Sequence, residues 1–155
     1  MINREHCRGG LLVIGYGNTL RCDDGVGPKV AAAVEALKLP GVRTLICQQL
    51  SPELAEPVSH ADRVVFVDAA VDAPKEVQLH PLKPGESSQL MAHAADPRTL
   101  LALARDVFGH PPKAWWLTIP AVKLGFGETL SPEAELGLLE AVESIRSLCH
   151  SVPPG

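Results

Sequence analysis

A chain of 155 residues with 46% hydrophobic and 21% charged residues has the composition of a soluble globular protein, and it is long enough for one domain with a single core. Its formal net charge of −4 provides no electrostatic attraction to nucleic acid or to an anionic membrane surface. No apolar run is long enough to span a bilayer, and the opening MINREHCRGG lacks the apolar core of a signal peptide, so we expect a cytoplasmic protein.

We expect a single domain over residues 1–155, with a core from about 11 to 149 and loose ends at 1–9 and 151–155. The cysteines form no C-x-x-C pair, which argues against a zinc knuckle or a thioredoxin-like site. In a reducing compartment all four are expected to be free thiols: Cys7, Cys22, Cys47 and Cys149.

The first predicted element is a strand over LLVIG (11–15), a short and fully apolar run. A glycine-rich stretch, GYGNTLRCDDGVGPKV (15–30), follows it directly and leads into a helix. That helix is predicted from apolar residues at helical spacing, with a proline in the first turn: Val26, Val30, Val34 and Leu37.

The next three elements are two strands and a short helix. VRTLIC (42–47) predicts a strand, and SPELAEPV (51–58) predicts a short helix with Ser51 as its cap and a proline at its first position. RVVFVDAA (63–70) contains four consecutive apolar residues, which is typical of a strand buried on both faces of a sheet.

The second half of the chain continues the alternation. EVQLHPL (76–82) alternates apolar and polar residues and contains a proline, which predicts an edge strand, and AWWLTIP (114–120) predicts a further strand. Asp96 with Pro97 opens one helix, and Ser131 with Pro132 opens the last one. We expect buried side chains on the first of these at Leu100, Leu101, Leu103, Ala104, Val107 and Phe108, and on the second at Leu138, Val142, Ile145 and Cys149.

Strands that alternate with helices predict an α/β fold, a three-layer sandwich with helices on both faces of a mostly parallel sheet. Ligands of such sheets bind outside the carboxyl ends of the strands. Candidate functional residues are therefore sought where strands end.

The glycine-rich stretch after the first strand suggests a phosphate-binding turn, but its details differ from one. The dinucleotide fingerprint needs a third glycine where this chain has Leu20, and no G-K-[ST] of a P-loop is present. Two adjacent carboxylates, Asp23 and Asp24, also stand where a phosphate would be repelled. One of them is expected to cap the helix that follows, and a hard cation would accommodate the second.

Two other side chains are predicted to lie over the same crevice. Asp68 ends the apolar strand stretch VVFVD, where its alternative role is to accept hydrogen bonds from backbone amides of the next turn. His93 lies in the loop before the helix that Pro97 opens, although a lone loop histidine is more often a surface residue. Two carboxylates and one imidazole together suit a divalent transition ion with positions left open for water or substrate.

Four sequence motifs resemble those of the [NiFe]-hydrogenase maturation endopeptidases. GYGNTLRCDDGVG resembles the family's G-x-G-N-x-L-x-x-D-[DE]-x-x-G opening, VVFVDA its second acidic motif, HAADPRTLLALA its histidine-plus-helix motif and IPAVKLGFGETLSPEAE its closing stretch. The match runs in order from about residue 11 to 148. QQLSPELAE is similar to the branch that serves cytoplasmic bidirectional, NAD-linked hydrogenases.

The resemblance implies a twisted, mixed five-stranded sheet between helices. It also implies one cleavage, which removes a C-terminal extension from the hydrogenase large-subunit precursor after nickel insertion. By motif position, the nickel ligands and catalytic residues would be Asp24, Asp68 and His93, with nickel supplied by the precursor and other divalent ions able to occupy the site. Asp23 is the candidate to take a proton from water.

Two alternatives remain open at this point. One is a non-catalytic nickel-binding maturation chaperone of the same partner, and the other is a nucleotide-binding α/β module. Cys22 near His93 also remains a candidate nucleophile. The glycines and Asn18 of the opening stretch are expected to shape a tight turn that holds carboxylates rather than phosphate.

Overall fold

The computed structural model describes residues 10–71, 75–85 and 96–150. Five strands form one sheet in the order β2-β1-β3-β5-β4. They are β1 (Leu11–Tyr16), β2 (Val42–Cys47), β3 (Arg63–Ala70), β4 (Gln78–Leu82) and β5 (Lys113–Pro120). All neighbouring pairs are parallel except β4 with β5, so β4 is the antiparallel edge strand that its proline predicts.

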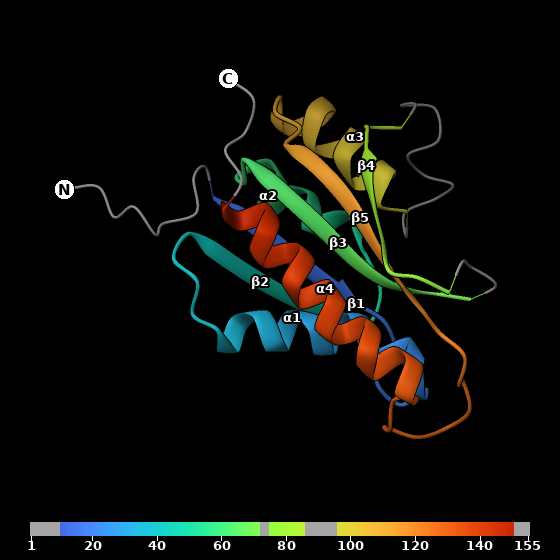
Figure 1. Cartoon of the computed structure of the whole chain (residues 1–155). Coiled ribbons are helices and arrows are strands. Elements are labelled where there is room, and N and C mark those ends of the chain that lie inside the picture. Colours follow the sequence, from blue (N-terminus) through green and yellow to red (C-terminus); the bar gives the residue numbers. More distant parts are fainter. Residues whose placement is uncertain (1–9, 72–74, 86–95, 151–155) are drawn as a thin grey trace.

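Helices cover both faces of the sheet, as Figure 1 shows. Helices α1 and α4 lie against one face, and α2 and α3 lie against the other. The bounds are η1 (Cys22–Gly25), α1 (Val26–Ala36), η2 (Pro52–Leu54), α2 (Ala55–Ser59), α3 (Pro97–Phe108) and α4 (Pro132–His150). The predicted three-layer α/β sandwich with a mixed, mostly parallel sheet is confirmed.

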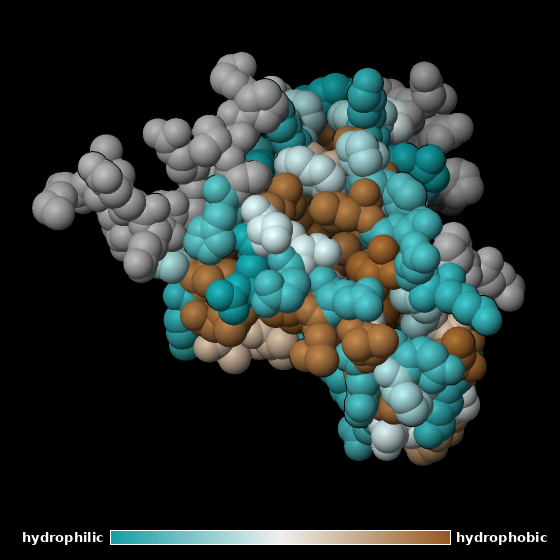
Figure 2. All heavy atoms as spheres, in the orientation of Figure 1, coloured by the Kyte–Doolittle hydropathy of each residue, from teal (hydrophilic) through white to brown (hydrophobic). Residues whose placement is uncertain are grey.

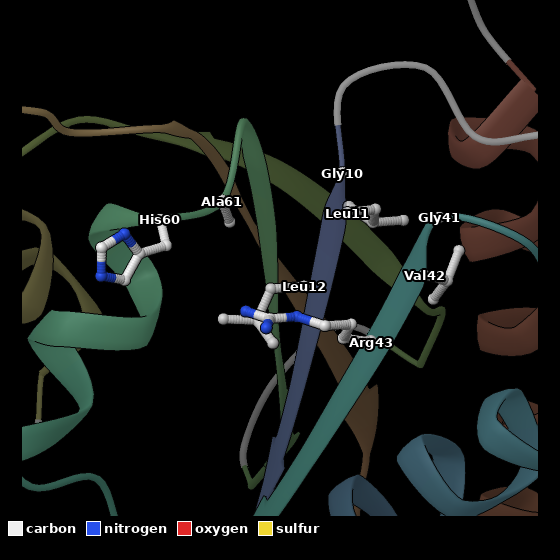
Figure 3. A pocket seen from close by; sticks show the side chains of 8 residues that line it. All are labelled: Gly10, Leu11, Leu12, Gly41, Val42, Arg43, His60 and Ala61. Atoms are coloured by element: carbon white, nitrogen blue, oxygen red, sulfur yellow. The ribbon is translucent and has the colours of Figure 1, made fainter.

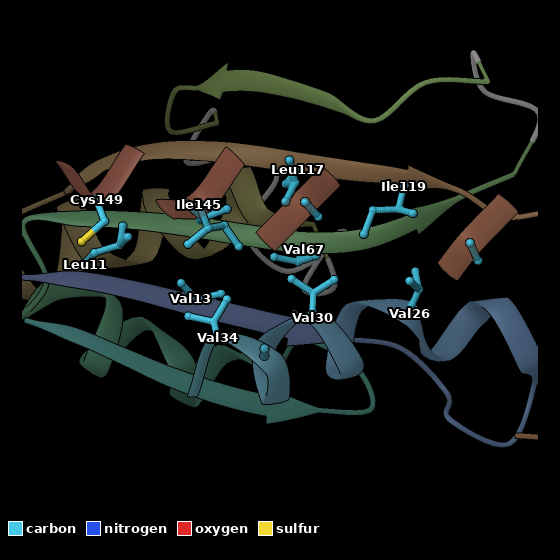
Figure 4. Close-up of a cluster of buried hydrophobic side chains, with 14 of the residues drawn as sticks. Leu11, Val13, Val26, Val30, Val34, Val67, Leu117, Ile119, Ile145 and Cys149 are labelled. Atoms are coloured by element: carbon cyan, nitrogen blue, oxygen red, sulfur yellow. The ribbon is translucent and has the colours of Figure 1, made fainter. Parts of the chain in front are cut away.

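The core is divided by the sheet into two apolar clusters. Successive side chains of a strand point to opposite faces, so Val13 packs with the α1 and α4 cluster while Leu12 packs with the α2 and α3 cluster. Figure 4 shows the first cluster, in which Val30 and Ile145 from the two helices meet Val67 of β3. Strand β3 occupies the centre of the sheet, which explains its unbroken apolar run.

The three predicted helix starts are present, and two of their caps have the expected hydrogen bonds. Asp96 Oδ1 accepts from the backbone amide of Arg98 at 2.8 Å, and Ser131 Oγ accepts from the amide of Ala134 at 3.1 Å. Ser51 is different, because its hydroxyl donates to Glu53 Oε1 at 2.8 Å and makes no side-chain cap. The start there depends on the extended Ser51 backbone and on Pro52 at the first helical position.

The predicted buried face is wrong at the end of α3, where Val107 and Phe108 in the last turn are 65% and 45% exposed. Leu37, just beyond α1, is likewise 39% exposed. Helical periodicity identifies the side of a helix that faces the core, but not the point at which the helix passes the end of the sheet.

The face that carries α4 also exposes apolar side chains. Figure 2 shows them over α4 and between α4 and β4. A shallow hollow there is lined by Leu79, Glu143, Ser144, Ser147 and Leu148. Among the described residues, no helix has both the length and the apolar character needed to cross a bilayer.

Candidate functional site at the carboxyl edge of the sheet

The carboxyl ends of β1 and β3 bring an aromatic hydroxyl and a carboxylate together. Gly15 of β1 pairs with Val67 of β3, and the pairing of these two strands ends there, next to Tyr16 and Asp68. The Tyr16 hydroxyl donates to Asp68 Oδ2 at 3.1 Å. Asp68 does not end its strand as predicted, because β3 continues beside β5 to Ala70, and its hydrogen-bond partner is a side chain.

The loop after β1 is shaped by hydrogen bonds that end on Asp24. Asn18 Oδ1 accepts from the amide of Leu20 at 2.9 Å, and the amide of Asn18 donates to Asp24 Oδ2 at 2.8 Å. Gly17 has a φ of 146°, and a Cβ there would overlap the carbonyl oxygen of Asp24. Asn18 thus shapes the loop as the sequence predicts, and the loop holds a carboxylate with an amide of the kind that a P-loop offers to phosphate.

Gly15 does not have the turn role that the sequence analysis assigned to it. It lies inside β1, and a Cβ at this position would overlap the carbonyl oxygen of Gly27 in α1. Gly27 is equally confined, because its own Cβ would lie 2.5 Å from the carbonyl oxygen of Val67 and 2.6 Å from that of Tyr16. This pair of glycines lets α1 pack directly against the strand ends that carry the site.

Asp23 has a different place from the one its sequence position suggests. Its side chain is fully buried, and its carboxylate accepts from the amides of Val122, Lys123 and Ser131 and from the Ser131 hydroxyl, at 2.7 to 2.9 Å. Burial opposes ionisation, but these hydrogen bonds from Ser131, Lys123 and Val122 hold the pKa of Asp23 below its ordinary value. Asp23 neither caps α1 nor has an oxygen available to water, so these contacts do not support its candidate role as the base.

Asp24 and Asp68 influence one another electrostatically. Burial raises the pKa of Asp68 to about 6, the Tyr16 hydrogen bond lowers it, and the charge of Asp24 raises it further. Burial and the neighbouring Asp68 likewise raise the pKa of the Tyr16 hydroxyl, so Tyr16 stays a hydrogen-bond donor. Two partly buried carboxylates that repel one another form a site that a cation would stabilise.

The raised pKa of Asp68 predicts how the stability of the fold depends on pH. The folded-state pKa of Asp68, about 6, lies above its ordinary value of 3.8, so the folded protein binds the Asp68 proton more tightly than the unfolded chain does. We therefore expect Asp68 to stabilise the fold increasingly as the pH falls from about 7 to about 4. The measurement is the difference in melting temperature between wild type and Asp68→Asn across this pH range. The contributions of all other carboxylates are the same in both proteins and cancel in this difference. A difference that stays constant with pH would contradict the assignment.

The described residues supply two of the three predicted metal ligands. His93 lies outside the described residues, and within the described ranges no group of three or more His, Cys, Asp and Glu side chains gathers around one point. Cys22 is buried with its thiol against Gly127, which does not favour it as a ready nucleophile. The site that the structure places is thus the pair Asp24 and Asp68, with Tyr16 bound to the second.

A pocket of about 300 Å³ lies at the other ends of the strands, where β1 and β2 begin (Figure 3). Arg43 of β2 and His60 after α2 flank it, and none of its lining residues is acidic. It does not suit a cation. Its lining residues are Gly10, Leu11, Leu12, Gly41, Val42, Arg43, His60 and Ala61.

Tyr16 is the residue that the sequence analysis missed. The signal was its place in β1, two residues after Ile14 and four after Leu12, which puts all three on the same face of the sheet. Asp68 follows Phe66 by two residues on that face as well. Alternation counted through both strand ends would have brought Tyr16 and Asp68 together.

The fold and the edge site define a three-layer α/β protein with a carboxylate pair at the carboxyl ends of its central strands. Solved structures with the same fold include the [NiFe] hydrogenase maturation protease HybD from Thermococcus kodakarensis, with a TM-score of 0.67, 26% identity and coverage of 90% of this chain and 99% of that one. The hydrogenase maturating endopeptidase HybD from E. coli gives a TM-score of 0.69 at 21% identity, covering 88% and 89%. The [NiFe] hydrogenase maturation protease HycI from Thermococcus kodakarensis KOD1 gives 0.70 at 19%, covering 92% and 94%.

Two of these structural neighbours are named as proteases and the third as an endopeptidase, and both terms denote enzymes that hydrolyse peptide bonds. No protein-family model and no curated protein sequence matches the chain. The fold of this chain is therefore that of structures named as hydrogenase maturation proteases.

Proposed function

We propose that the chain is an endopeptidase that removes the C-terminal extension of a [NiFe]-hydrogenase large-subunit precursor after nickel has been inserted. The observation that carries the proposal is the Asp24 and Asp68 pair, which η1 and β3 bring to one edge of a sheet whose fold is shared with hydrogenase maturation proteases. The sequence motifs around both aspartates support the same activity.

In this proposal nickel arrives with the substrate. Asp24 and Asp68 would hold it together with His93, and the ion would polarise the scissile carbonyl as a Lewis acid. The donor chemistry fits a transiently held ion, because two partly buried carboxylates repel one another without a cation but are hard ligands that bind nickel weakly by themselves. The free protein should therefore bind nickel weakly, with ligands of the precursor completing the coordination.

The chain's own residues contribute position and a proton acceptor. Tyr16 holds Asp68 Oδ2, and the Asn18 amide holds Asp24 Oδ2, so both carboxylates are oriented before a substrate arrives. A carboxylate with a pKa of about 6 is largely ionised at neutral pH and is suited to accept a proton from water. We assign this capacity to Asp68 rather than to Asp23, whose oxygens are buried and already bonded.

The proposal also includes the type of hydrogenase that is cleaved and the compartment in which this happens. QQLSPELAE, whose PEL residues form η2, supports a hydrogenase of the cytoplasmic bidirectional, NAD-linked type as the substrate. The protein would then act in the cytoplasm, without nucleic acid or membrane. A panel of precursor large subunits from different hydrogenase classes tests this assignment by which one is shortened.

The test of the activity is to mix the protein with a nickel-loaded large-subunit precursor and to weigh the products. We expect one cut and a shorter large subunit. A precursor that is bound but keeps its mass would instead support the nickel-binding chaperone. A rise in melting temperature with added nucleotide would support the nucleotide-binding module.

Separate chelation of the two partners tests where nickel resides. Each partner is treated with a chelator, freed of it and recombined with its untreated counterpart. We expect cleavage to be lost when the precursor is treated and kept when the protease is treated, because only the precursor brings the ion. Loss upon treating the protease alone, reversed by added metal, would instead identify a resident metal centre.

A further inference from the structure

The segment between β5 and α4, residues 121–131, is bonded along its length to the loop between β1 and α1. Main-chain hydrogen bonds join Cys22 to Gly127 at 2.7 Å, Gly127 to Leu20 at 2.8 Å and Asp23 to Lys123 at 2.9 Å. Arg21 and Gly127 also form an isolated parallel bridge. These two segments are about a hundred residues apart in the chain, yet they form one structural unit at the site.

Asp23 is the side chain at the centre of this unit. Both of its oxygens accept hydrogen bonds from the 121–131 segment, with Ser131 bonded through its amide and its hydroxyl at 2.7 Å each. Val122 and Lys123 donate their amides to Asp23 Oδ2 at 2.9 Å each. Because Asp23 and Ser131 are both buried, removal of the Asp23 carboxylate would leave the Ser131 amide and hydroxyl without this acceptor in the protein interior.

The same side chain also determines where its neighbour lies. Asp23 and Asp24 are consecutive residues of η1, a single turn of 3-10 helix with no side-chain cap. Cys22, which opens that turn, has a φ of 49°, a conformation that an L residue keeps only where its surroundings impose it. The bonds from Ser131, Val122 and Lys123 to Asp23 are the surroundings that hold this turn, and therefore the backbone from which Asp24 projects.

We propose that Asp23 is a positioning residue, which locks the loop between β1 and α1 to the segment before α4 and thereby fixes Asp24 at the site. The importance of Asp24 itself rests on the proposed function, but its placement by Asp23 does not. Ser131 has a paired role, since its hydroxyl donates to Asp23 Oδ2 while accepting from the amide of Ala134 at the start of α4. The last helix and the site loop are thus tied to one carboxylate.

The test uses the full chain and reads the position of Asp24 directly. The amide of Asn18 donates to Asp24 Oδ2, so its hydrogen-exchange rate, followed by NMR, reports whether that carboxylate stays in place. In Asp23→Asn an amide NH₂ group replaces one of the acceptor oxygens, and we expect exchange at Asn18 to accelerate at least about tenfold. Ser131→Ala, which leaves Asp23 intact, should produce a smaller acceleration in the same direction.

A matched control separates positioning from general stability. Val34→Ala removes buried side-chain atoms from α1 without touching either segment, so it lowers the melting temperature but should leave exchange at Asn18 unchanged well below that temperature. Unchanged Asn18 exchange in both Asp23→Asn and Ser131→Ala would overturn the proposal. If Asp23→Asn does not fold, the comparison of Ser131→Ala with Val34→Ala decides the question. The proposal then requires faster exchange at Asn18 in Ser131→Ala than in Val34→Ala.

A cleavage assay then distinguishes this role from that of a base. A positioning role predicts that Ser131→Ala lowers the processing rate along with Asp23→Asn, and that the double variant is no worse than Asp23→Asn alone, because both act through one contact. A base at Asp23 predicts lost cleavage in Asp23→Asn, full activity in Ser131→Ala and normal Asn18 exchange in both. If wild type cleaves no precursor, the proposed function fails while the exchange measurements still decide the positioning role.

Discussion

Replacing Asp68 by alanine should abolish precursor cleavage while leaving a folded protein. The change removes one of the two carboxylates at the sheet edge and leaves Asp24 alone to meet the substrate's cation. We expect the processing rate to fall by on the order of 100-fold or more, the scale on which a positioned acid or base contributes. At neutral pH the melting temperature should change little, because the lost hydrogen bond to Tyr16 is offset by removal of a partly buried charge.

Asp62→Ala is the matched control for this prediction. Asp62 is exposed and lies just before β3, at the end of the strand opposite to Asp68. The Asp62→Ala variant should therefore process the precursor at the wild-type rate. Mass spectrometry of the large subunit after incubation with each variant gives the comparison, and near-normal cleavage by Asp68→Ala would remove Asp68 from the site.

Gly27→Val should cause the largest loss of stability of any substitution considered for this site. Its Cβ would lie 2.5 Å from the carbonyl oxygen of Val67 and 2.6 Å from that of Tyr16, and neither backbone can move without displacing a strand of the central sheet. We expect a loss of about 3 kcal/mol or more in the free energy of unfolding. For a chain of this size that corresponds to a fall of roughly 10 °C in melting temperature.

Gly125→Val provides the comparison. A Cβ at Gly125 would have no heavy atom within 4 Å, so the same substitution there should leave the melting temperature within a few degrees of wild type. Thermal unfolding followed by circular dichroism measures both variants. A Gly27→Val protein as stable as Gly125→Val would show that α1 does not pack on the strand ends as described.

Much of the fold could be predicted from the sequence, because its elements follow from local patterns. The unbroken apolar run of β3, the alternation and proline of β4 and the Asp96 and Ser131 caps each reflect physics that acts within a few residues. The Ser51 cap was wrong, because the Ser51 hydroxyl donates to Glu53 and accepts from no backbone amide of the helix. Local preference names the candidates for a hydrogen bond, but it does not decide which of them forms.

The candidate site was only partly predictable, for a reason that Asp23 and Asp24 illustrate. These adjacent carboxylates have the same local sequence, yet one is fully buried against segment 121–131 and the other is partly exposed at the sheet edge. The difference depends on contacts with residues about a hundred positions away, and local sequence patterns do not predict such contacts. Tyr16, by contrast, lies one residue beyond the predicted strand 11–15, and strand alternation continued by that residue places it on the face of Leu12 and Ile14.

The long-range tie between Asp23 and Ser131 has a consequence for the order of events during synthesis. Ribosomes deliver the chain from its N-terminus, so β1, β3 and both edge carboxylates emerge well before residue 131. Until that residue appears, Asp23 lacks its two hydrogen bonds from Ser131, and the turn at Cys22 lacks part of the contacts that hold it. A nascent or truncated chain that stops before Ser131 would therefore have its sheet strands without a fully ordered site, and competence to act would appear only after residue 131 has emerged.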